Sequence, residues 1–295
     1  MKKWFKYVSL GVVLLLVLGA LAAAYAYFIE PQRLVINKQD LKIANWNPAL
    51  NGFRIVAISD IHGGSNGVSA EKIRQIVEAA NAQDPDIIVL LGDYISERWD
   101  RKGLNMPMAE IADNLSGLRA KFGVFAVLGN HDSWSRDLRV APELERVGIN
   151  VLENEVVTIS RGGANLRILG LIDHQQVLDW RAFSRDVKRV LESRDQTGDV
   201  IVLEHSPDVL PMITGELLVS DKLKLMLAGH THGGQVWLPI LGRPVVPSSY
   251  GQKYAAGHLR DRDLDLFVTT GVGESILPFR FMVPPEIAVL TVGAE

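Results

Sequence analysis

The sequence has no cysteine and no marked excess of charge of either sign. Its 295 residues therefore form no disulfide and offer no thiolate to a metal ion. Any bound metal must be held by histidine, carboxylate or amide oxygen, a ligand set that favours pairs of Mn, Fe or Zn over a structural zinc. Because 31 Lys and Arg oppose 34 Asp and Glu, the net charge is only −3, and no nucleic-acid-binding surface is evident.

Charged side chains are also missing from residues 7–29, where Val, Leu and Ala dominate. About 20 apolar residues suffice for a helix to cross a hydrocarbon core of roughly 30 Å. We therefore expect residues 1–30 to form a transmembrane anchor. The alternative is a cleaved signal peptide, with Lys2, Lys3 and Lys6 as its basic region and Ala22–Ala24 as its cleavage site. The anchor is favoured because the apolar run exceeds the usual apolar region of a signal peptide, which has about 7 to 15 residues.

The charges that flank this segment predict its orientation. Three lysines precede it, so by the positive-inside rule the N-terminus is cytoplasmic and the rest of the chain extracytoplasmic. Arg33, Lys38 and Lys42 follow the segment and favour the opposite orientation. We divide the rest of the chain into a polar connector over 31–51 and one domain over 52–295.

The domain alternates short apolar runs with amphipathic stretches. The runs predict strands over 53–59, 86–91, 123–128, 167–172, 200–203, 223–228, 266–270 and 286–292. Helical spacing predicts helices over 69–82, with Ser69 as its N-cap, and over 107–120. The second half has more strand character and fewer clear helices. We expect an α/β (α+β) fold in which two facing β-sheets are flanked by helices.

Polar residues follow the first three predicted strands. Asp60 ends the first, Asp93 follows the second, and the third ends on Gly129-Asn130-His131-Asp132. Two later runs end on Glu204-His205 and on Gly229-His230-Thr231-His232. Open α/β sheets bind ligands at the carboxyl ends of their strands, so we expect these residues to meet in one site.

The residue types indicate a pair of divalent cations. Such a pair, about 3.5 to 4 Å apart, needs a bridging carboxylate and neutral or anionic ligands from several strand ends. Asp93 is the candidate bridge. One residue separates Asp60 from His62, so a single turn can direct both to one metal. The full candidate set is Asp60, His62, Asp93, Asn130, His205, His230 and His232.

These motifs, in this order over about 53–235, resemble the calcineurin-like metallophosphoesterase family. The resemblance implies a sandwich of two mixed sheets and hydrolysis of phosphodiesters or phosphomonoesters by a hydroxide that bridges two metals. It implies that Asp60, His62 and His232 hold one metal. It gives Asn130, His205 and His230 to the other, with Asp93 shared. His131 binds neither metal in this scheme and would protonate the leaving group, oriented by Asp132.

A bacterial branch of that family is also similar. Three features carry this resemblance: the apolar N-terminal segment, the extended motif 229–235, and a tail with Gly271-Val272-Gly273-Glu274-Ser275 and Pro278-Phe279-Arg280. The branch comprises membrane-associated phosphodiesterases related to UDP-2,3-diacylglucosamine pyrophosphatases. It implies a lipid-linked or nucleotide-linked substrate and a single-pass protein of a bacterial inner or cell membrane. From another functional class, a catalytically inactive metal-binding scaffold at the membrane is the alternative.

Four further residues lie outside the ligand motifs. We expect His174 and His258 to be structural or surface residues. The alternative for His174, which follows Asp173 at the end of an apolar run, is that it reaches the cleft. Arg243 and Arg280 are either phosphate clamps or solvated surface arginines, because a guanidinium matches phosphate in a bidentate way. Gly162-Gly163 predicts a hairpin turn rather than a phosphate-binding loop.

Overall fold

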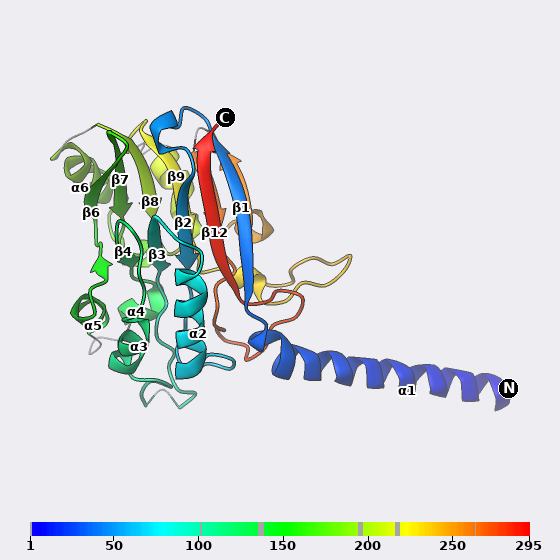
Figure 1. The fold of residues 1–295 in the computed structure, drawn as a ribbon. Coiled ribbons are helices and arrows are strands. Elements are labelled where there is room, and N and C mark those ends of the chain that lie inside the picture. Colours follow the sequence, from blue (N-terminus) through cyan, green and yellow to red (C-terminus); the bar gives the residue numbers. More distant parts are fainter. Residues whose placement is uncertain (1, 101, 135–138, 194–196, 216–218, 263) are drawn as a thin grey trace.

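Two six-stranded mixed sheets pack face to face in the computed structural model, with helices on both outer faces (Figure 1). The structure describes residues 2–100, 102–134, 139–193, 197–215, 219–262 and 264–295. The first sheet runs, in spatial order, β1 (Val35–Ile43), β12 (Glu286–Ala294), β2 (Phe53–Ile58), β3 (Ile87–Leu91), β4 (Val124–Val127) and β5 (Asn150–Val151). The second runs β10 (Gly257–Asp261), β11 (Leu264–Val268), β9 (Leu223–Ala228), β8 (Asp199–Leu203), β7 (Ala164–Gly170) and β6 (Glu155–Arg161). This architecture confirms the predicted fold class.

The central strands of both sheets are parallel. Strands β2, β3 and β4 pair in parallel in the first sheet, and β7, β8, β9 and β11 do so in the second. Strand β3 reads Ile-Ile-Val-Leu-Leu and is buried along its whole length. Such continuous apolar runs are typical of parallel strands covered on both faces. The carboxyl ends of these strands lie along one edge of the sandwich.

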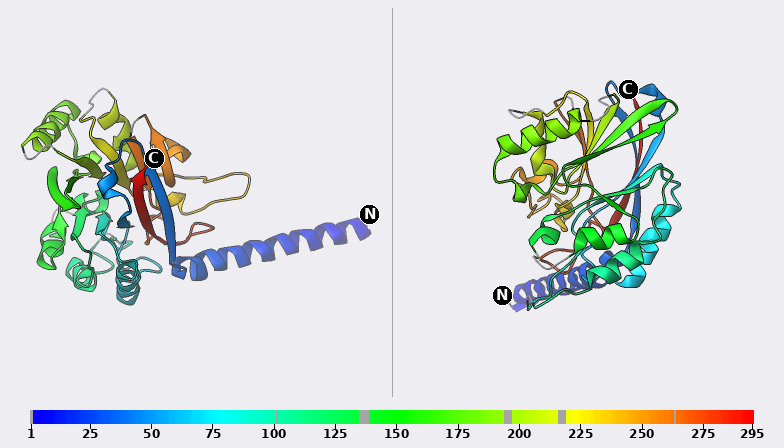
Figure 2. Two further views of the ribbon diagram at one scale, coloured as in Figure 1. Left: turned by 45° about the horizontal axis from the view of Figure 1, so that its top comes forward. Right: turned by 90° about the vertical axis from the view of Figure 1, so that its left-hand side faces the viewer.

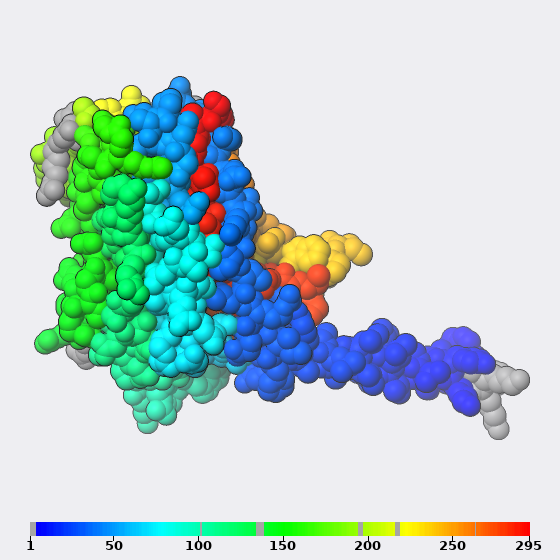
Figure 3. All heavy atoms as spheres, in the orientation of Figure 1, coloured from blue at the N-terminus to red at the C-terminus, as the bar shows by residue number. Residues whose placement is uncertain are grey.

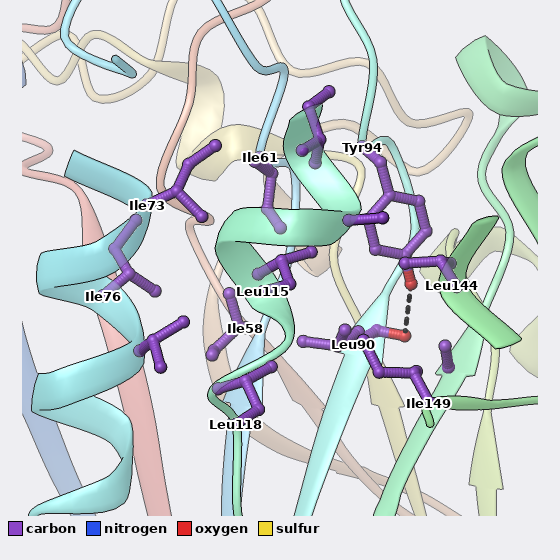
Figure 4. Packing of buried hydrophobic residues seen from close by; sticks show 14 of the residues in the cluster. Ile58, Ile61, Ile73, Ile76, Leu90, Tyr94, Leu115, Leu118, Leu144 and Ile149 are labelled. Carbon is purple, nitrogen blue, oxygen red and sulfur yellow. Dashed lines mark hydrogen bonds between the residues drawn. The ribbon is translucent and has the colours of Figure 1, made fainter. Parts of the chain in front are cut away.

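Three apolar layers hold the sandwich together. The middle layer joins the inner faces of the two sheets, with Phe53, Val89 and Leu203 among its members. The second covers the outer face of the first sheet with α2 (Ala70–Asn81), α3 (Met108–Leu115) and α5 (Val140–Arg146), as Figure 4 shows in part. The third packs α6 (Trp180–Glu192) and α7 (Leu210–Thr214) on the second sheet.

The predicted strands are all present, with ends that shift by up to three residues. Helix α2 begins after Ser69, whose Oγ accepts a hydrogen bond from Lys72 N at 3.2 Å, so the predicted N-cap is confirmed. Helix α3 stops at Leu115, five residues before the predicted end. The hairpin between β6 and β7 turns at Gly162-Gly163, as predicted. Helix α6, with 13 residues, was not predicted.

The segment 31–51 differs from the predicted connector. Its residues 35–43 form β1, which pairs in parallel with β12 from Val35–Glu286 to Ile43–Ala294. The strand lies at a sheet edge, and several of its polar side chains face solvent, so it lacks the apolar pattern that marks the inner strands. The division of the chain into an anchor, a connector and a domain otherwise stays a prediction.

The N-terminal helix α1 (Lys2–Ala24) projects away from the sandwich in every view (Figures 1 and 2). The candidate membrane span covers Trp4–Gln32 and contains an 18-residue window with a mean hydropathy of 2.5, in which nearly all side chains are exposed. Its C-terminal turns are bound to the domain. Tyr27 O accepts a hydrogen bond from Asn66 Nδ2 at 2.8 Å, and Glu30 Oε2 accepts one from Met282 N at 2.9 Å.

The layer beneath α2 can be tested at Ile76, which is fully buried there. Ile76→Ala should lower the free energy of unfolding by about 2 to 5 kcal/mol, because it removes buried apolar contacts and leaves a cavity. Glu78→Ala, on the exposed face of the same helix, should change it by less than about 0.5 kcal/mol. Urea unfolding of the detergent-solubilised chain measures both. Equal effects of the two substitutions would contradict this packing.

Candidate metal centre and substrate cleft

All seven predicted ligands converge at the edge where the parallel strands end. Asp60 and His62 follow β2, Asp93 follows β3, and Asn130 begins α4 (Asn130–Trp134) directly after β4. The second sheet adds His205 after β8, and His230 and His232 after β9. The two sheets thus contribute to a single site. Each ligand is buried except His230, which is partly exposed.

One group of donors consists of Asp60, His62 and His232, whose ligand atoms all lie within 4.8 Å of one another. His232 Nε2 is 3.3 Å from Asp60 Oδ1. Among the described residues, Asp60 Oδ1 and His62 Nε2 have no hydrogen-bond partner although they are buried. Leaving buried polar atoms unsatisfied is costly, and a cation between them would satisfy both.

A second group contains Asp93, His205 and His230. His205 Nε2 lies 3.3 Å from Asp93 Oδ2 and 3.1 Å from both Asn130 Oδ1 and His230 Nδ1. The same Asp93 oxygen is 3.5 Å from His62 Nε2 in the first group. Asp93 Oδ2 therefore lies between the two groups, where a carboxylate that bridges two cations would have to be.

The histidines are oriented by backbone carbonyls. His62 Nδ1 donates to Ile95 O at 2.9 Å, and His205 Nδ1 donates to Leu91 O at 2.7 Å. A carbonyl only accepts hydrogen bonds, so Nδ1 carries a proton in both rings. Each ring consequently directs Nε2 toward the centre of the site, as is usual for histidines that bind metals.

The backbone of the site is strained. Five of the seven ligands have a left-handed φ, between 43° and 67°: Asp60, His62, Asp93, His230 and His232. Residues other than glycine rarely adopt this conformation, and it concentrates at functional sites. Glycines allow the turns to approach closely, since a Cβ on Gly129 would collide with Asp93 Oδ1, and one on Gly229 with Ser59 Oγ.

Burial and charge set the protonation of the donors. Burial lowers the pKa of His62 and of His230 to about 4, so both are neutral at pH 7, the form that binds metals. Burial alone would raise the pKa of Asp93, but His205 and His62 outweigh it and the pKa falls well below its usual value. Asp93 in turn raises the pKa of His205, against the effect of burial. The buried carboxylate requires positive charge beside it, which divalent cations would supply.

Asp132 fixes the turns around this centre. Its carboxylate accepts hydrogen bonds from the backbone N–H groups of Asp93 (2.7 Å), Tyr94 (2.9 Å) and Gly129 (2.9 Å). These bonds join the turn that carries Asp93 to the turn that carries Asn130. Asp132 thereby positions the proposed bridge, and its predicted action on His131 stays a prediction.

His131 faces both the donors and the cleft. Its ring centroid is 4.9 Å from that of His62, and its Nε2 is 3.4 Å from Ser275 Oγ. Its ligand atom also lies within 4.8 Å of those of His62 and Asp93. The side chain is partly exposed to a cleft of about 1800 Å³. It can reach a phosphoester bound at the donors, which is what the predicted role as an acid requires.

His174, expected to be a structural or surface residue, lines the cleft. Its Nδ1 lies 3.2 Å from Asp173 Oδ1 and 3.7 Å from Glu204 Oε1, and both carboxylates are fully buried. Burial alone would lower the pKa of His174, but these two carboxylates raise it to about 10. The signal available in the sequence was that Asp173-His174 follows an apolar run, as the ligand motifs do.

Arg280 was expected to be either a phosphate clamp or a solvated surface arginine, and the structure shows that it is neither. It is fully buried, and its guanidinium donates to the carbonyls of Thr270 (2.9 Å) and Val283 (3.1 Å) and to that of Gly273. It holds the segment that follows β11 in place. His258, as expected, is structural, with Nε2 bonded to Asp265 Oδ1 at 2.7 Å.

Glu274 is a cleft residue that sequence reasoning did not identify. It is 4% exposed, and among the described residues neither carboxylate oxygen has a hydrogen-bond partner. Burial raises its pKa to about 8, although Arg280 opposes the shift. The sequence feature that could have identified Glu274 is its place in the segment Gly271–Ser275. Gly273 in this segment allows the chain to pass close to the backbone of Asp60 and Ile61.

Comparison with known proteins agrees with this geometry. The calcineurin-like phosphoesterase family matches residues 53–234. Metallophosphoesterase YkuE of Bacillus subtilis is 30% identical over 279 residues, which cover 92% of this chain and 92% of the relative. Phosphodiesterase YaeI of Escherichia coli is 28% identical over 269 residues, which cover 90% of this chain and 91% of the relative.

Two further similarities extend the comparison. A Danio rerio protein named transmembrane protein with metallophosphoesterase domain is 27% identical over 93% of this chain and 61% of its own length. The structure of a candidate 5′-nucleotidase of Staphylococcus aureus superposes with a TM-score of 0.50 at 11% identity, covering 82% of this chain and 54% of the other. The latter likeness concerns the fold alone.

The close approach of Gly129 to Asp93 can be tested directly. Gly129→Ala should displace the Asp93 carboxylate and lower metal affinity by about 10- to 100-fold, as disturbances around metal ligands do. Gly293→Ala should have no effect, because its added Cβ would meet neighbours no closer than 3.5 Å. Isothermal titration of the metal-stripped protein with Mn²⁺ measures both. Full affinity in Gly129→Ala would contradict the arrangement.

The charge of His174 depends on its two carboxylates. Glu204→Gln should lower its pKa from about 10 toward its ordinary value of 6.5, whereas the exposed Glu145→Gln should not. Because folding raises this pKa, the pairing stabilises the fold fully below about pH 6.5, and this stabilisation is lost as pH rises toward 10. Histidine ¹⁵N NMR titration of the metal-stripped protein measures the shift. An unchanged pKa would show that Glu204 does not hold the imidazole charged.

Proposed function

This chain belongs to the calcineurin-like phosphoesterase family, and on that premise we propose that it hydrolyses phosphoesters with two divalent cations held around Asp93. One observation carries the proposal. Asp93 Oδ2 lies between two groups of buried donors, 3.5 Å from His62 Nε2 and 3.3 Å from His205 Nε2. Buried histidines gathered around a buried carboxylate, with donors left unsatisfied, fit a pair of cations better than a hydrogen-bonded core.

The donors would divide as the family resemblance implies. Asp60, His62 and His232 would hold one cation, Asn130, His205 and His230 the other, and Asp93 both. Histidine, carboxylate and amide ligands suit Mn, Fe or Zn. When bound, two such ions polarise the phosphoryl group and lower the pKa of water enough to supply hydroxide at neutral pH.

The protein's own groups would then perform three tasks. Asp132, through its bonds to Asp93 N and Gly129 N, holds the bridging ligand in place. His131, beside the donors and exposed to the cleft, would give a proton to the departing alkoxide. His174, on the cleft wall near His230, would donate a hydrogen bond to the substrate; the ring centroids of these histidines are 6.3 Å apart.

We place the protein at a membrane, anchored by the segment Trp4–Gln32. Its length and hydropathy are sufficient for a span, and the Danio rerio relative is named a transmembrane protein. The lysines that precede the segment favour an extracytoplasmic domain, whereas Arg33, Lys38 and Lys42 favour a cytoplasmic one, which a substrate in the cytoplasmic leaflet would require. The substrate would be a phosphodiester or phosphomonoester that is lipid-linked or nucleotide-linked. UDP-2,3-diacylglucosamine is the specific candidate, and the name phosphodiesterase of the Escherichia coli relative agrees with the bond type.

An enzyme and an inactive scaffold respond differently to two substitutions. His131→Ala should lower kcat by about 10²- to 10⁴-fold, because it removes a proton donor, while the protein keeps its metal. Asp93→Asn should lose both metal and turnover. His258→Gln, outside the cleft, should keep both. The measurement is hydrolysis of bis-p-nitrophenyl phosphate, a phosphomonoester and UDP-2,3-diacylglucosamine by the Mn-loaded full chain, with metal content determined in parallel. Failure on all three substrates with both metal sites filled would leave only the scaffold.

A further inference from the structure

Two loops near the cleft expose apolar side chains to solvent. The first, residues 238–245, lies between β9 and β10 and exposes Ile240 fully, Leu241 to 71% and Val245 to 68%. The second, residues 276–282, connects β11 to β12 and exposes Ile276 (89%) together with Leu277 and Met282. We call them the apolar loops. Exposed apolar clusters of this kind mark interaction surfaces.

The apolar loops extend from the same side of the domain as α1. Figure 1 and the left view of Figure 2 show the yellow 238–245 loop and the red-orange 276–282 loop on the side from which the helix projects. The space-filling view shows them as a lobe beside the base of α1 (Figure 3). A bilayer crossed by this helix would therefore meet these loops first.

The position of the loops relative to the helix is fixed by contacts. Arg280 N donates to Ala26 O at 3.1 Å, and the Tyr25 and Phe281 rings pack with centroids 6.4 Å apart. Asn66 Nδ2 joins both segments, because it donates to Tyr27 O and to Pro278 O at 2.9 Å or less. The last turns of the helix and the second apolar loop thus form one unit. The depth of the helix in a bilayer would therefore set the depth of this loop.

The residues at the loop tips are unusual for their conformation. Ile240 has φ 74° and Ile276 has φ 65°, both in the left-handed region. A β-branched side chain is disfavoured there, and glycine would fit without strain. Isoleucine at these two positions would be explained if its side chain contacts an apolar surface outside the domain.

The cleft joins this surface to the metal centre. Its wall includes Tyr27, from the end of the membrane segment, and Ile276, Leu277 and Pro278 of the second apolar loop. Its polar part contains His62, Asp93 and His131. A ligand that fills the cleft would meet apolar side chains on the side of α1 and the metal ligands at the other end.

We propose that the apolar loops insert into the surface of the lipid bilayer beside α1, and that the cleft takes its phosphoester from a lipid in that bilayer. The acyl chains would stay at the membrane side while the phosphate reaches the donors. This inference rests on the proposed phosphoesterase function and on the membrane span. A bilayer is favoured over a protein partner because the apolar tips project along an apolar helix that already requires lipid around it.

Loop insertion can be measured with a fluorophore on one introduced cysteine, because the chain has no native cysteine that would also react. This measurement does not depend on enzymatic activity. The full-length Leu241→Cys protein is labelled with an environment-sensitive fluorophore and reconstituted into phosphatidylcholine–phosphatidylglycerol vesicles. The emission of the fluorophore should then shift to shorter wavelength. Lipids that carry a spin label should also quench it. The matched control is Leu178→Cys, which is 99% exposed and lies two residues before α6, a helix on the opposite side of the domain from α1 (Figure 1). The same water-like emission at both positions would overturn the insertion.

Access from the bilayer is tested with two substrates that share one scissile bond. Bis-p-nitrophenyl phosphate is soluble, and a diacylglycerol p-nitrophenyl phosphodiester is held in the vesicles. Ile240→Ser with Leu241→Ser should lower turnover of the lipid-borne ester by about fivefold or more and leave the soluble ester unchanged, since less apolar surface enters the bilayer. Leu178→Ser should affect neither.

The outcomes separate the two proposals. Equal loss on both esters, or no loss on the lipid-borne one, would overturn membrane access through the loops. If the Mn-loaded wild-type protein cleaved neither ester, the proposed function itself would fail, while the fluorescence measurement would still decide whether the loops insert.

Discussion

The buried carboxylate of Asp93 is the constraint on which the site depends. It lies 2% exposed between two groups of histidines, so little solvent can reach its charge. His205 and His62 hold its pKa low, and Asp132 fixes its backbone. Burying an anion in this way is costly unless positive charge accompanies it. The arrangement of histidines, carboxylates and an amide oxygen around it follows from that requirement.

The fold meets the requirement by directing parallel strands of both sheets to one edge. A single strand end can supply one or two donors, as β2 does with Asp60 and His62. Seven donors need several strand ends, and the sandwich provides five of them. This convergence strains the backbone, because most ligands adopt left-handed conformations. Glycines allow the turns to pack closely against one another. Packing in the three apolar layers stabilises the fold and offsets the free energy of this strain.

Much of this organisation can be predicted from sequence, and the exceptions share a physical reason. Inner strands such as β3 are continuous apolar runs, and their polar ends mark the donors, so fold class and convergence were both predictable. Edge strand β1 is half exposed and has no such pattern. The role of His174 depends on Glu204, which is distant in the chain and which only the fold brings near. The role of Arg280 depends on nearby backbone carbonyls, whose positions no side-chain pattern reveals. The helical segment 180–192 was missed although its N-cap, Asp179, was visible.

The central claim is that two cations share Asp93. Electron paramagnetic resonance of the full chain loaded with Mn²⁺ tests it most directly, because two ions on one carboxylate are magnetically coupled. We predict two Mn²⁺ per chain, a spectrum with the features of a coupled pair, and loss of the coupling in Asp93→Asn. A six-line spectrum of isolated Mn²⁺ at full loading would contradict the account.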